Sequence, residues 1–143
     1  MSEDLNVKMD VIKSLKRIVS DSTILASNTS SISITKLASN YSNPQNFVGM
    51  HFMNPVPKMQ LVELIKGFQT SQETLKITEN LVEKMGKVFT CAEDIPGFIV
   101  NRILMPYINE AIFVLYEVKK VDTIRSLVYL HSYLYTIHIY LFI

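Results

Sequence analysis

His51 and Glu63 are the residues whose types and spacing are suited to acid–base chemistry. His51 lies in GMHFMNPVP at residues 49–57, and Glu63 lies in MQLVELI at residues 59–65. The proline-bearing turn between these segments brings strand ends together, so we expect the imidazole and the carboxylate to meet. A carboxylate on one ring nitrogen fixes the tautomer and leaves the other nitrogen free to take a substrate proton. Spacing alone also allows a His51 satisfied by the backbone and a Glu63 paired with a lysine.

The elements that must position these two residues alternate between helix and strand. An apolar stripe from Val11 to Val19 predicts a half-buried helix at about 5–20, and SISITKLAS predicts a short helix at 31–39 entered from serine. Short apolar runs predict strands at 22–27, 46–52, 59–65 and 87–91. This alternation is typical of an α/β fold, and we expect a parallel sheet covered by helices.

A further helix is predicted between the last two of these strands. Thr70 and Glu73 match a capping box, and Gly86 is suited to end the helix. Its buried face is expected to consist of Leu75, Leu81, Val82 and Met85.

The character of the chain changes after Pro96 and Gly97, which mark a boundary. The next twenty or so residues, GFIVNRILMPYINEAIFVLY, are apolar around nearly the whole helix, so another part of a protein must bury them. The tail 124–143 is long enough to span a membrane, but Arg125, His131 and His138 would be costly there, so no membrane location is expected. A helix for an absent partner and a tail not native to the fold remain alternatives. Two histidines without acidic or cysteine neighbours do not predict a metal site.

Composition excludes several other classes of protein. The 143 residues suffice for one ordinary domain, and a net charge of +1 provides no basic surface for nucleic acid. The single Cys91 cannot form an internal disulfide, and residues 1–30 contain no secretory signal. We therefore expect a reducing compartment, either the cytoplasm or the mitochondrial matrix.

Four long motifs resemble the 3-hydroxyacyl-CoA dehydrogenase family, in particular its 3-hydroxybutyryl-CoA dehydrogenase-like members. They are ILASNTSSISITKLAS, GMHFMNPVPKMQLVELIKG, TSQET and DIPGFIVNRILMPYINEA, and the resemblance runs from about residue 3 to residue 118. It implies an oxidoreductase of fatty acid (β-oxidation) or butanoate metabolism, which interconverts 3-hydroxyacyl-CoA and 3-oxoacyl-CoA with NAD. It also implies an acyl-CoA substrate and a homodimer for full-length relatives.

The resemblance assigns roles residue by residue. His51 matches the catalytic base and Glu63 the carboxylate that orients it, while Ser30 matches the serine that binds the reacting oxygen. Asn101 matches the asparagine that fixes the substrate carbonyl, and Asn54 matches a further active-site asparagine. The cofactor-binding residues implied by the resemblance are Asn28, Lys8 and Glu3.

The sequence departs from the family pattern at both ends. The family begins with a strand, a G-x-G-x-x-G turn and a helix that bind the pyrophosphate of NAD, whereas the glycines here are isolated at 49, 67, 86 and 97. We therefore expect a fragment with an unpaired sheet edge. Its expected domains are part of a Rossmann-like NAD-binding domain at 1–95, the start of a helical C-terminal domain at 96–120, and an apolar tail at 121–143.

Two hypotheses of function follow. In the first, the chain is part of a dehydrogenase and carries its base, orienting carboxylate and substrate contacts, although the 143-residue chain by itself is inactive. In the second, the chain is a non-catalytic remnant that binds acyl-CoA weakly or associates with a full-length relative.

Overall fold

A four-stranded sheet with helices packed on both faces forms the first of two compact units. The structure is a computed structural model that describes residues 3–118, and the first unit ends at Arg102. The elements are α1 (Leu5–Leu15), β1 (Leu25–Ser27), α2 (Ile34–Ala38), the 3-10 helix η1 (Pro44–Asn46), β2 (Phe47–Phe52), β3 (Leu61–Lys66), α3 (Gln72–Lys84), β4 (Val88–Glu93) and α4 (Val100–Val118).

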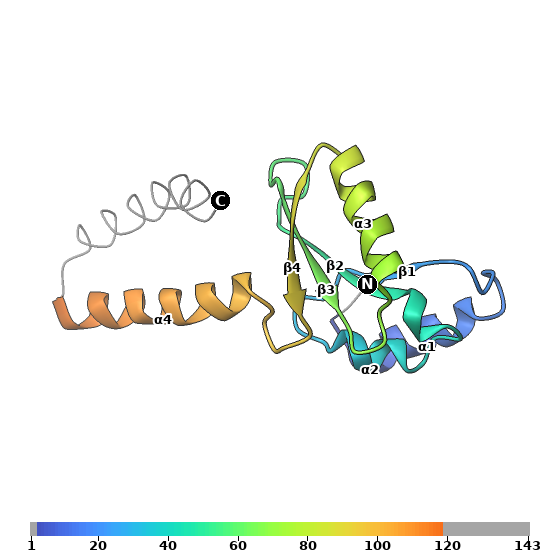
Figure 1. Ribbon diagram of the computed structural model, residues 1–143. Coiled ribbons are helices and arrows are strands. Elements are labelled where there is room, and N and C mark those ends of the chain that lie inside the picture. The colour runs from blue at the N-terminus through green and yellow to red at the C-terminus, as the bar shows by residue number, and fades with distance from the viewer. Residues whose placement is uncertain (1–2, 119–143) are drawn as a thin grey trace. The chain divides into compact units, whose positions relative to one another are not determined.

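The sheet has the strand order β1-β2-β3-β4 (Figure 1). β1 pairs with β2 and β3 pairs with β4 in parallel, whereas β2 and β3 are antiparallel. The predicted α/β fold is confirmed, but the prediction of an entirely parallel sheet is wrong at its centre. The loop between β2 and β3 is too short for a crossover helix, so these strands form a hairpin. In the sheet of the described residues, β1 is an edge strand, as expected.

The two faces of the sheet are covered by different helices. Figure 1 shows α1 and α2 together on one side and α3 on the other. Successive side chains of a strand point to opposite faces, so Phe47 of β2 packs with the α1–α2 core while Val48 packs with the α3 core. This alternation places His51 on the same face as Phe47.

Gly49 lets α2 approach the sheet closely. A Cβ at this position would lie 2.8 Å from Ile65 Cβ and 2.9 Å from Ile34 Cδ1, closer than side chains tolerate. Ile34 and Ile65 are both fully buried. Glycine at 49 therefore sets the distance between α2 and the hairpin that carries His51.

The helix boundaries differ in places from the sequence prediction, and α2 spans Ile34–Ala38 within the predicted 31–39. α1 ends at Leu15 rather than at about residue 20, and Asp4 caps its first turn by accepting from the Val7 N–H. The predicted capping box at Thr70 is wrong, because Ser71 caps α3 instead. The Thr70 hydroxyl donates to the Phe47 carbonyl and so ties the start of α3 to β2.

Two of the four residues predicted for the buried face of α3 are buried. Leu75 and Val82 are buried, but Leu81 and Met85 are 43% and 47% exposed. Thr78 is buried in their place, and its hydroxyl is satisfied by the Thr74 and Leu75 carbonyls one turn earlier. As predicted, Gly86 follows the helix, with a positive φ of 70°.

α4 is the long apolar helix that the sequence predicts, with Pro106 inside it. Several of its large apolar side chains are exposed, among them Ile103, Ile112 and Phe113. Within residues 3–118, no helix combines the length and the hydropathy needed to cross a membrane. The predictions for the tail at 121–143 lie outside the described residues.

Candidate functional site

His51 and Glu63 face each other across the β2–β3 hairpin. They are direct partners in the antiparallel register, and His51 Nδ1 lies 2.7 Å from Glu63 Oε2. Both side chains are buried, with His51 6% and Glu63 0% exposed. The contact expected from the sequence is therefore present, and it rests on the pairing of two adjacent strands.

The second carboxylate oxygen of Glu63 is held by the backbone at the beginning of α4. Glu63 Oε1 accepts from the N–H groups of Ile99 and Val100, each at 2.9 Å. The preceding residues Gly97 and Phe98 both have positive φ, 78° and 50°, which turns these donors toward the carboxylate. The sequence did not predict this pair of donors. Pro96 and Gly97 indicated only a boundary in the chain, and nothing in the pattern linked the following N–H groups to Glu63.

These contacts keep Glu63 ionised. Burial by itself raises the pKa of its carboxyl, but hydrogen bonds from His51, Val100 and Ile99 and the charge of His51 outweigh it and lower the pKa below 4.5. An ionised carboxylate only accepts, so the proton of a neutral His51 ring resides on Nδ1. Nε2 is then the nitrogen with a free lone pair.

Ser30 lies at that nitrogen. Its Oγ is 3.1 Å from His51 Nε2, and its carbonyl accepts from Asn101 Nδ2 at 3.3 Å. Phe98, nearly fully buried, packs its ring edge-on to the imidazole with 5.6 Å between ring centroids. Four residues predicted from the sequence, Ser30, His51, Glu63 and Asn101, thus form one connected cluster, with Phe98 as an addition.

The other two predicted asparagines lie outside this cluster. Asn28 Oδ1 accepts from the Phe52 N–H at 2.8 Å and so joins the end of β1 to the end of β2. Asn54 is exposed on the loop after β2, and no described hydrogen bond links it to Ser30 or His51.

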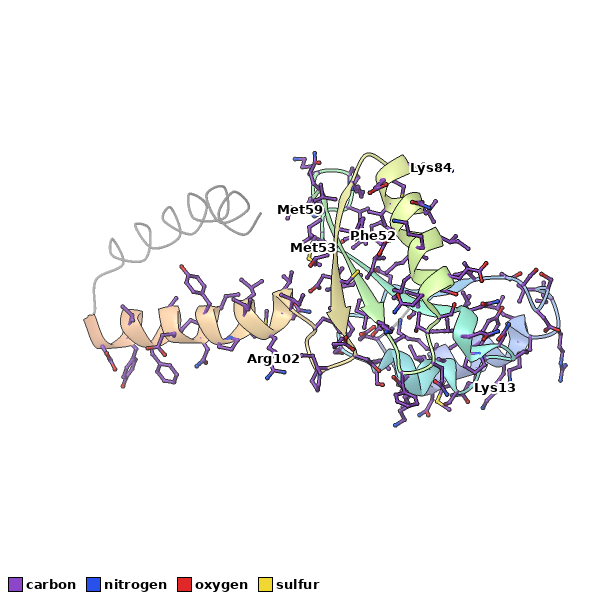
Figure 2. The ribbon with its side chains drawn as sticks, in the orientation of Figure 1. Lys13, Phe52, Met53, Met59, Lys84 and Arg102 are labelled. Atoms are coloured by element: carbon purple, nitrogen blue, oxygen red, sulfur yellow. The ribbon has the colours of Figure 1, made fainter. Side chains whose placement is uncertain are left out.

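Lys87 anchors the loop between β2 and β3, which carries Asn54. Its ammonium donates to the carbonyls of Val56 and Met59, both at 2.7 Å. Met59 and Met53 lie on this loop at the end of the hairpin (Figure 2). Lys87, immediately before β4, therefore restrains the segment that carries Asn54.

Glu3 contacts both Lys8 and the loop that carries Ser30. The Lys8 ammonium lies 3.3 Å from Glu3 Oε2, and Glu3 Oε1 accepts from the Ser30 N–H at 2.8 Å. Lys8 is buried, although lysine is rarely so unless it is paired.

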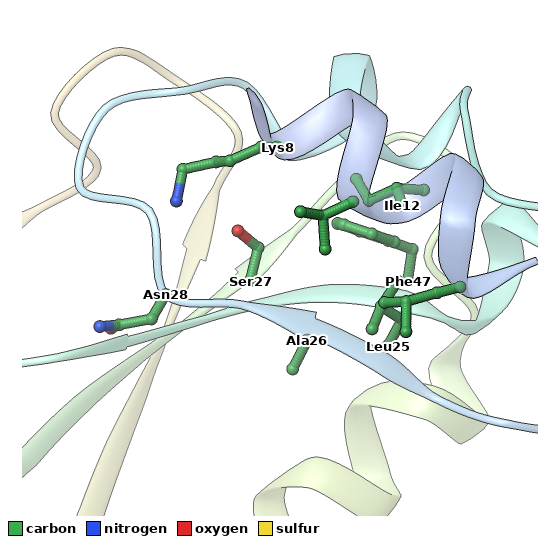
Figure 3. A pocket seen from close by; sticks show the side chains of 9 residues that line it. Lys8, Ile12, Leu25, Ala26, Ser27, Asn28 and Phe47 are labelled. Carbon is green, nitrogen blue, oxygen red and sulfur yellow. The ribbon is translucent and has the colours of Figure 1, made fainter. Parts of the chain in front are cut away.

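A hollow of about 340 Å³ lies between α1 and β1. Figure 3 shows Lys8, Ser27 and Asn28 at one end of it and apolar side chains such as Ile12 and Phe47 at the other. An ammonium, a hydroxyl and an amide can bind ribose hydroxyls or a carboxamide, so this end fits the nicotinamide part of NAD.

Among residues 3–118, no glycine-rich loop is found that could bind the pyrophosphate of NAD. A Cβ at Gly49 or Gly67 would meet Ile34, so these glycines pack against α2 rather than leave room for a ligand. Gly86 and Gly97 occupy turns with positive φ that follow α3 and precede α4. No glycine-rich phosphate loop is formed by these four residues.

Comparisons with known proteins identify the family of the chain. The family model described as "3-hydroxyacyl-CoA dehydrogenase, NAD binding domain" matches residues 1–95. A probable 3-hydroxybutyryl-CoA dehydrogenase of Deinococcus radiodurans is 56% identical over 110 residues, which are 77% of this chain and 40% of that protein. One of Bacillus subtilis is 51% identical over 117 residues, 82% of this chain and 41% of the relative.

Solved structures show the same likeness. The (S)-3-hydroxybutyryl-CoA dehydrogenase of Ralstonia eutropha has a TM-score of 0.79 and 50% sequence identity, over 83% of this chain and 42% of that one. The chain thus spans about 40% of the length of these relatives. The family match covers most of the sequence and includes Ser30, His51 and Glu63, and the chain therefore belongs to the 3-hydroxyacyl-CoA dehydrogenase family.

Proposed function

We propose that this chain supplies the acid–base site of an NAD-dependent enzyme that interconverts 3-hydroxyacyl-CoA and 3-oxoacyl-CoA. The observation that carries the proposal is the chain of contacts from Ser30 Oγ to His51 Nε2 and from His51 Nδ1 to Glu63. A histidine oriented by a buried carboxylate, with its other nitrogen at a hydroxyl, is the arrangement of a general base. Family membership and the names of the relatives support the substrate class.

In the oxidation direction, His51 Nε2 takes the proton of the substrate's 3-hydroxyl. The hydrogen on the same carbon leaves as hydride, and the carbon–oxygen bond becomes a carbonyl. Glu63 stabilises the imidazolium that results, because its carboxylate stays charged. In the reverse direction, the imidazolium returns the proton to the developing alkoxide.

Ser30 is proposed to bind the substrate, and Asn101 to position Ser30. The Ser30 hydroxyl, beside Nε2, is placed to donate to the reacting oxygen, while Asn101 supports Ser30 through its carbonyl. A role for Asn101 and Asn54 toward the substrate itself rests on the resemblance.

NAD, when bound, supplies the acceptor or donor of the hydride. Lys8, Ser27 and Asn28 border the hollow that would hold its nicotinamide end. The phosphate-binding glycines are not part of this sequence, so we expect the 143-residue chain alone not to oxidise NADH with acetoacetyl-CoA. We also propose the domain limits 1–95, 96–120 and 121–143 for this chain.

A chimera tests the proposal directly. Residues 3–118 are placed in the Bacillus subtilis relative in place of the segment they match, which restores the rest of the enzyme. We expect NADH oxidation with acetoacetyl-CoA, reduced by about 10²–10⁴-fold in His51→Gln. Lys13→Gln, at an exposed position on α1, serves as the control.

A folded chimera without activity, beside an active parent, would contradict the proposal. It would favour the second candidate, a non-catalytic remnant that binds acyl-CoA weakly or associates with a full-length relative. Calorimetric titration of the 143-residue chain with acetoacetyl-CoA then measures whether acyl-CoA binding persists. NADH oxidation by the isolated chain, lost in His51→Gln, would refute the expected inactivity.

A further inference from the structure

Glu3 lies two residues before α1, and both of its carboxylate oxygens contact other groups of the protein. Oε1 accepts from the Ser30 N–H at 2.8 Å, the Ser31 N–H at 3.1 Å and the Ser31 hydroxyl at 3.2 Å. The Thr29 hydroxyl also donates to Oε1, and Lys8 pairs with Oε2. A single side chain thus gathers the polar groups of three consecutive residues.

Thr29 ties this arrangement to the rest of the loop. It is fully buried, and its Oγ1 accepts from the Ile32 N–H at 2.9 Å while its hydroxyl proton goes to Glu3. Burial raises the pKa of Glu3, but bonds from Thr29, Ser30 and Lys8 outweigh it and lower the pKa to about 2. The loop between β1 and α2 is therefore organised around an ionised carboxylate.

Ser30 is restrained at three points. Its N–H is bound to Glu3, its carbonyl accepts from Asn101, and its hydroxyl lies 3.1 Å from His51 Nε2. With both ends of its backbone held, the position of the hydroxyl depends on one side-chain torsion. Removing the bond to the N–H frees the backbone on the side toward β1.

We propose that Glu3 is a positioning residue that holds the Ser30 hydroxyl against His51. The carboxylate acts through the backbone of Ser30 and Ser31, and its two oxygens are already occupied by protein donors. The inference depends on the proposed function only for the catalytic meaning of the Ser30–His51 contact. The Ser30–His51 contact itself is measured without substrate or cofactor. A negative result for the role of Glu3 can therefore be told apart from a negative result for the proposed function.

The test is NMR spectroscopy of the 143-residue chain and its Glu3→Gln variant. The amide signals of Ser30 and Ser31 and the Nε2 signal of His51 are recorded, the latter assigned among the three histidines with His51→Gln. We expect all three signals to move, with Nε2 shifting toward the value of a nitrogen without a hydrogen bond. The amides of Ile99 and Val100, which report on Glu63, should stay in place.

Asp10→Asn is the matched control, because it removes another carboxylate paired with a lysine from the same segment. It should leave every one of these signals unchanged, and movement of Nε2 in this control would overturn the proposal. So would an unchanged Nε2 signal in Glu3→Gln. If Glu3→Gln does not fold, Glu3→Asp is used in its place. This variant keeps the negative charge, but its side chain is one methylene shorter, so the carboxylate no longer reaches the Ser30 N–H. The same shift of Nε2 is expected, and its absence counts against the proposal.

Discussion

His51 Nδ1 and Glu63 Oε2 are 2.7 Å apart because the two residues are direct partners in an antiparallel strand pair. The backbone register, rather than a flexible loop, sets this distance. The same carboxylate also accepts two backbone N–H groups from the start of α4. Glu63 is thus the residue that joins the hairpin to the segment after β4.

Glu63→Gln should destabilise the chain. The amide has one acceptor oxygen, so its NH₂ group must face either the His51 Nδ1–H or the N–H groups of Ile99 and Val100. A buried donor left without an acceptor costs about 1–3 kcal/mol, and we expect a loss of that size in urea denaturation. Glu83→Gln, at an exposed position of α3, should change the free energy of unfolding by less than about 0.5 kcal/mol. Equal effects of the two variants would contradict the buried pair.

Stability should fall in acid. The pKa of Glu63 is lowered, and that of Glu3 is lowered from 4.5 to about 2. A group with a depressed pKa contributes stability above its unfolded value and loses it as the pH falls through its folded value. Urea midpoints should therefore drop between pH 4.5 and 2, and Glu3→Gln should show a shallower drop. A variant curve parallel to that of the wild type would argue against the Glu3 contacts.

Gly49→Ala should disturb the packing of α2 on the sheet. The new methyl would lie within 3.0 Å of Ile34 and Ile65, which are both buried and cannot withdraw easily. We expect a cost of about 3 kcal/mol, the upper range of overpacking, measured by thermal unfolding. Gly86→Ala has free space but a φ of 70°, and it should cost only about 1 kcal/mol. The reverse order would be inconsistent with the close approach at Gly49.

Lys87→Met should loosen the loop between β2 and β3. The carbonyls of Val56 and Met59 lose a charged donor, and such bonds contribute about 1.5–3 kcal/mol. Amide hydrogen exchange of Val56 and of residues 58–60 is expected to accelerate by about 10- to 100-fold. Lys84→Met, at an exposed position at the end of α3, is the control. Unchanged exchange in Lys87→Met would show that other contacts hold the loop.

The sequence by itself indicated the element types and placed His51 and Glu63 on neighbouring strands, so that their contact was expected although spacing alone left it open. Apolar periodicity and the prolines at 55 and 57 are local signals, and they place two strands and a tight turn where the structure has them. Ser30 and Asn101 were predicted as site residues only from the resemblance to a family. They lie too far from His51 in the sequence for their spacing to indicate a contact.

Tertiary structure alone decided which groups complete the site. The N–H donors of Ile99 and Val100 belong to the backbone, which carries no side-chain signature, and only the chain path after β4 brings them to Glu63. Glu3 reaches Ser30 because α1 packs near β1, a contact that depends on the whole fold. The register that sets His51 opposite Glu63 was not visible in the sequence either, because the alternation of side chains along each strand does not say which residues of two strands face each other. Local chemistry thus specifies the elements, whereas the packing of distant segments specifies how their polar groups meet.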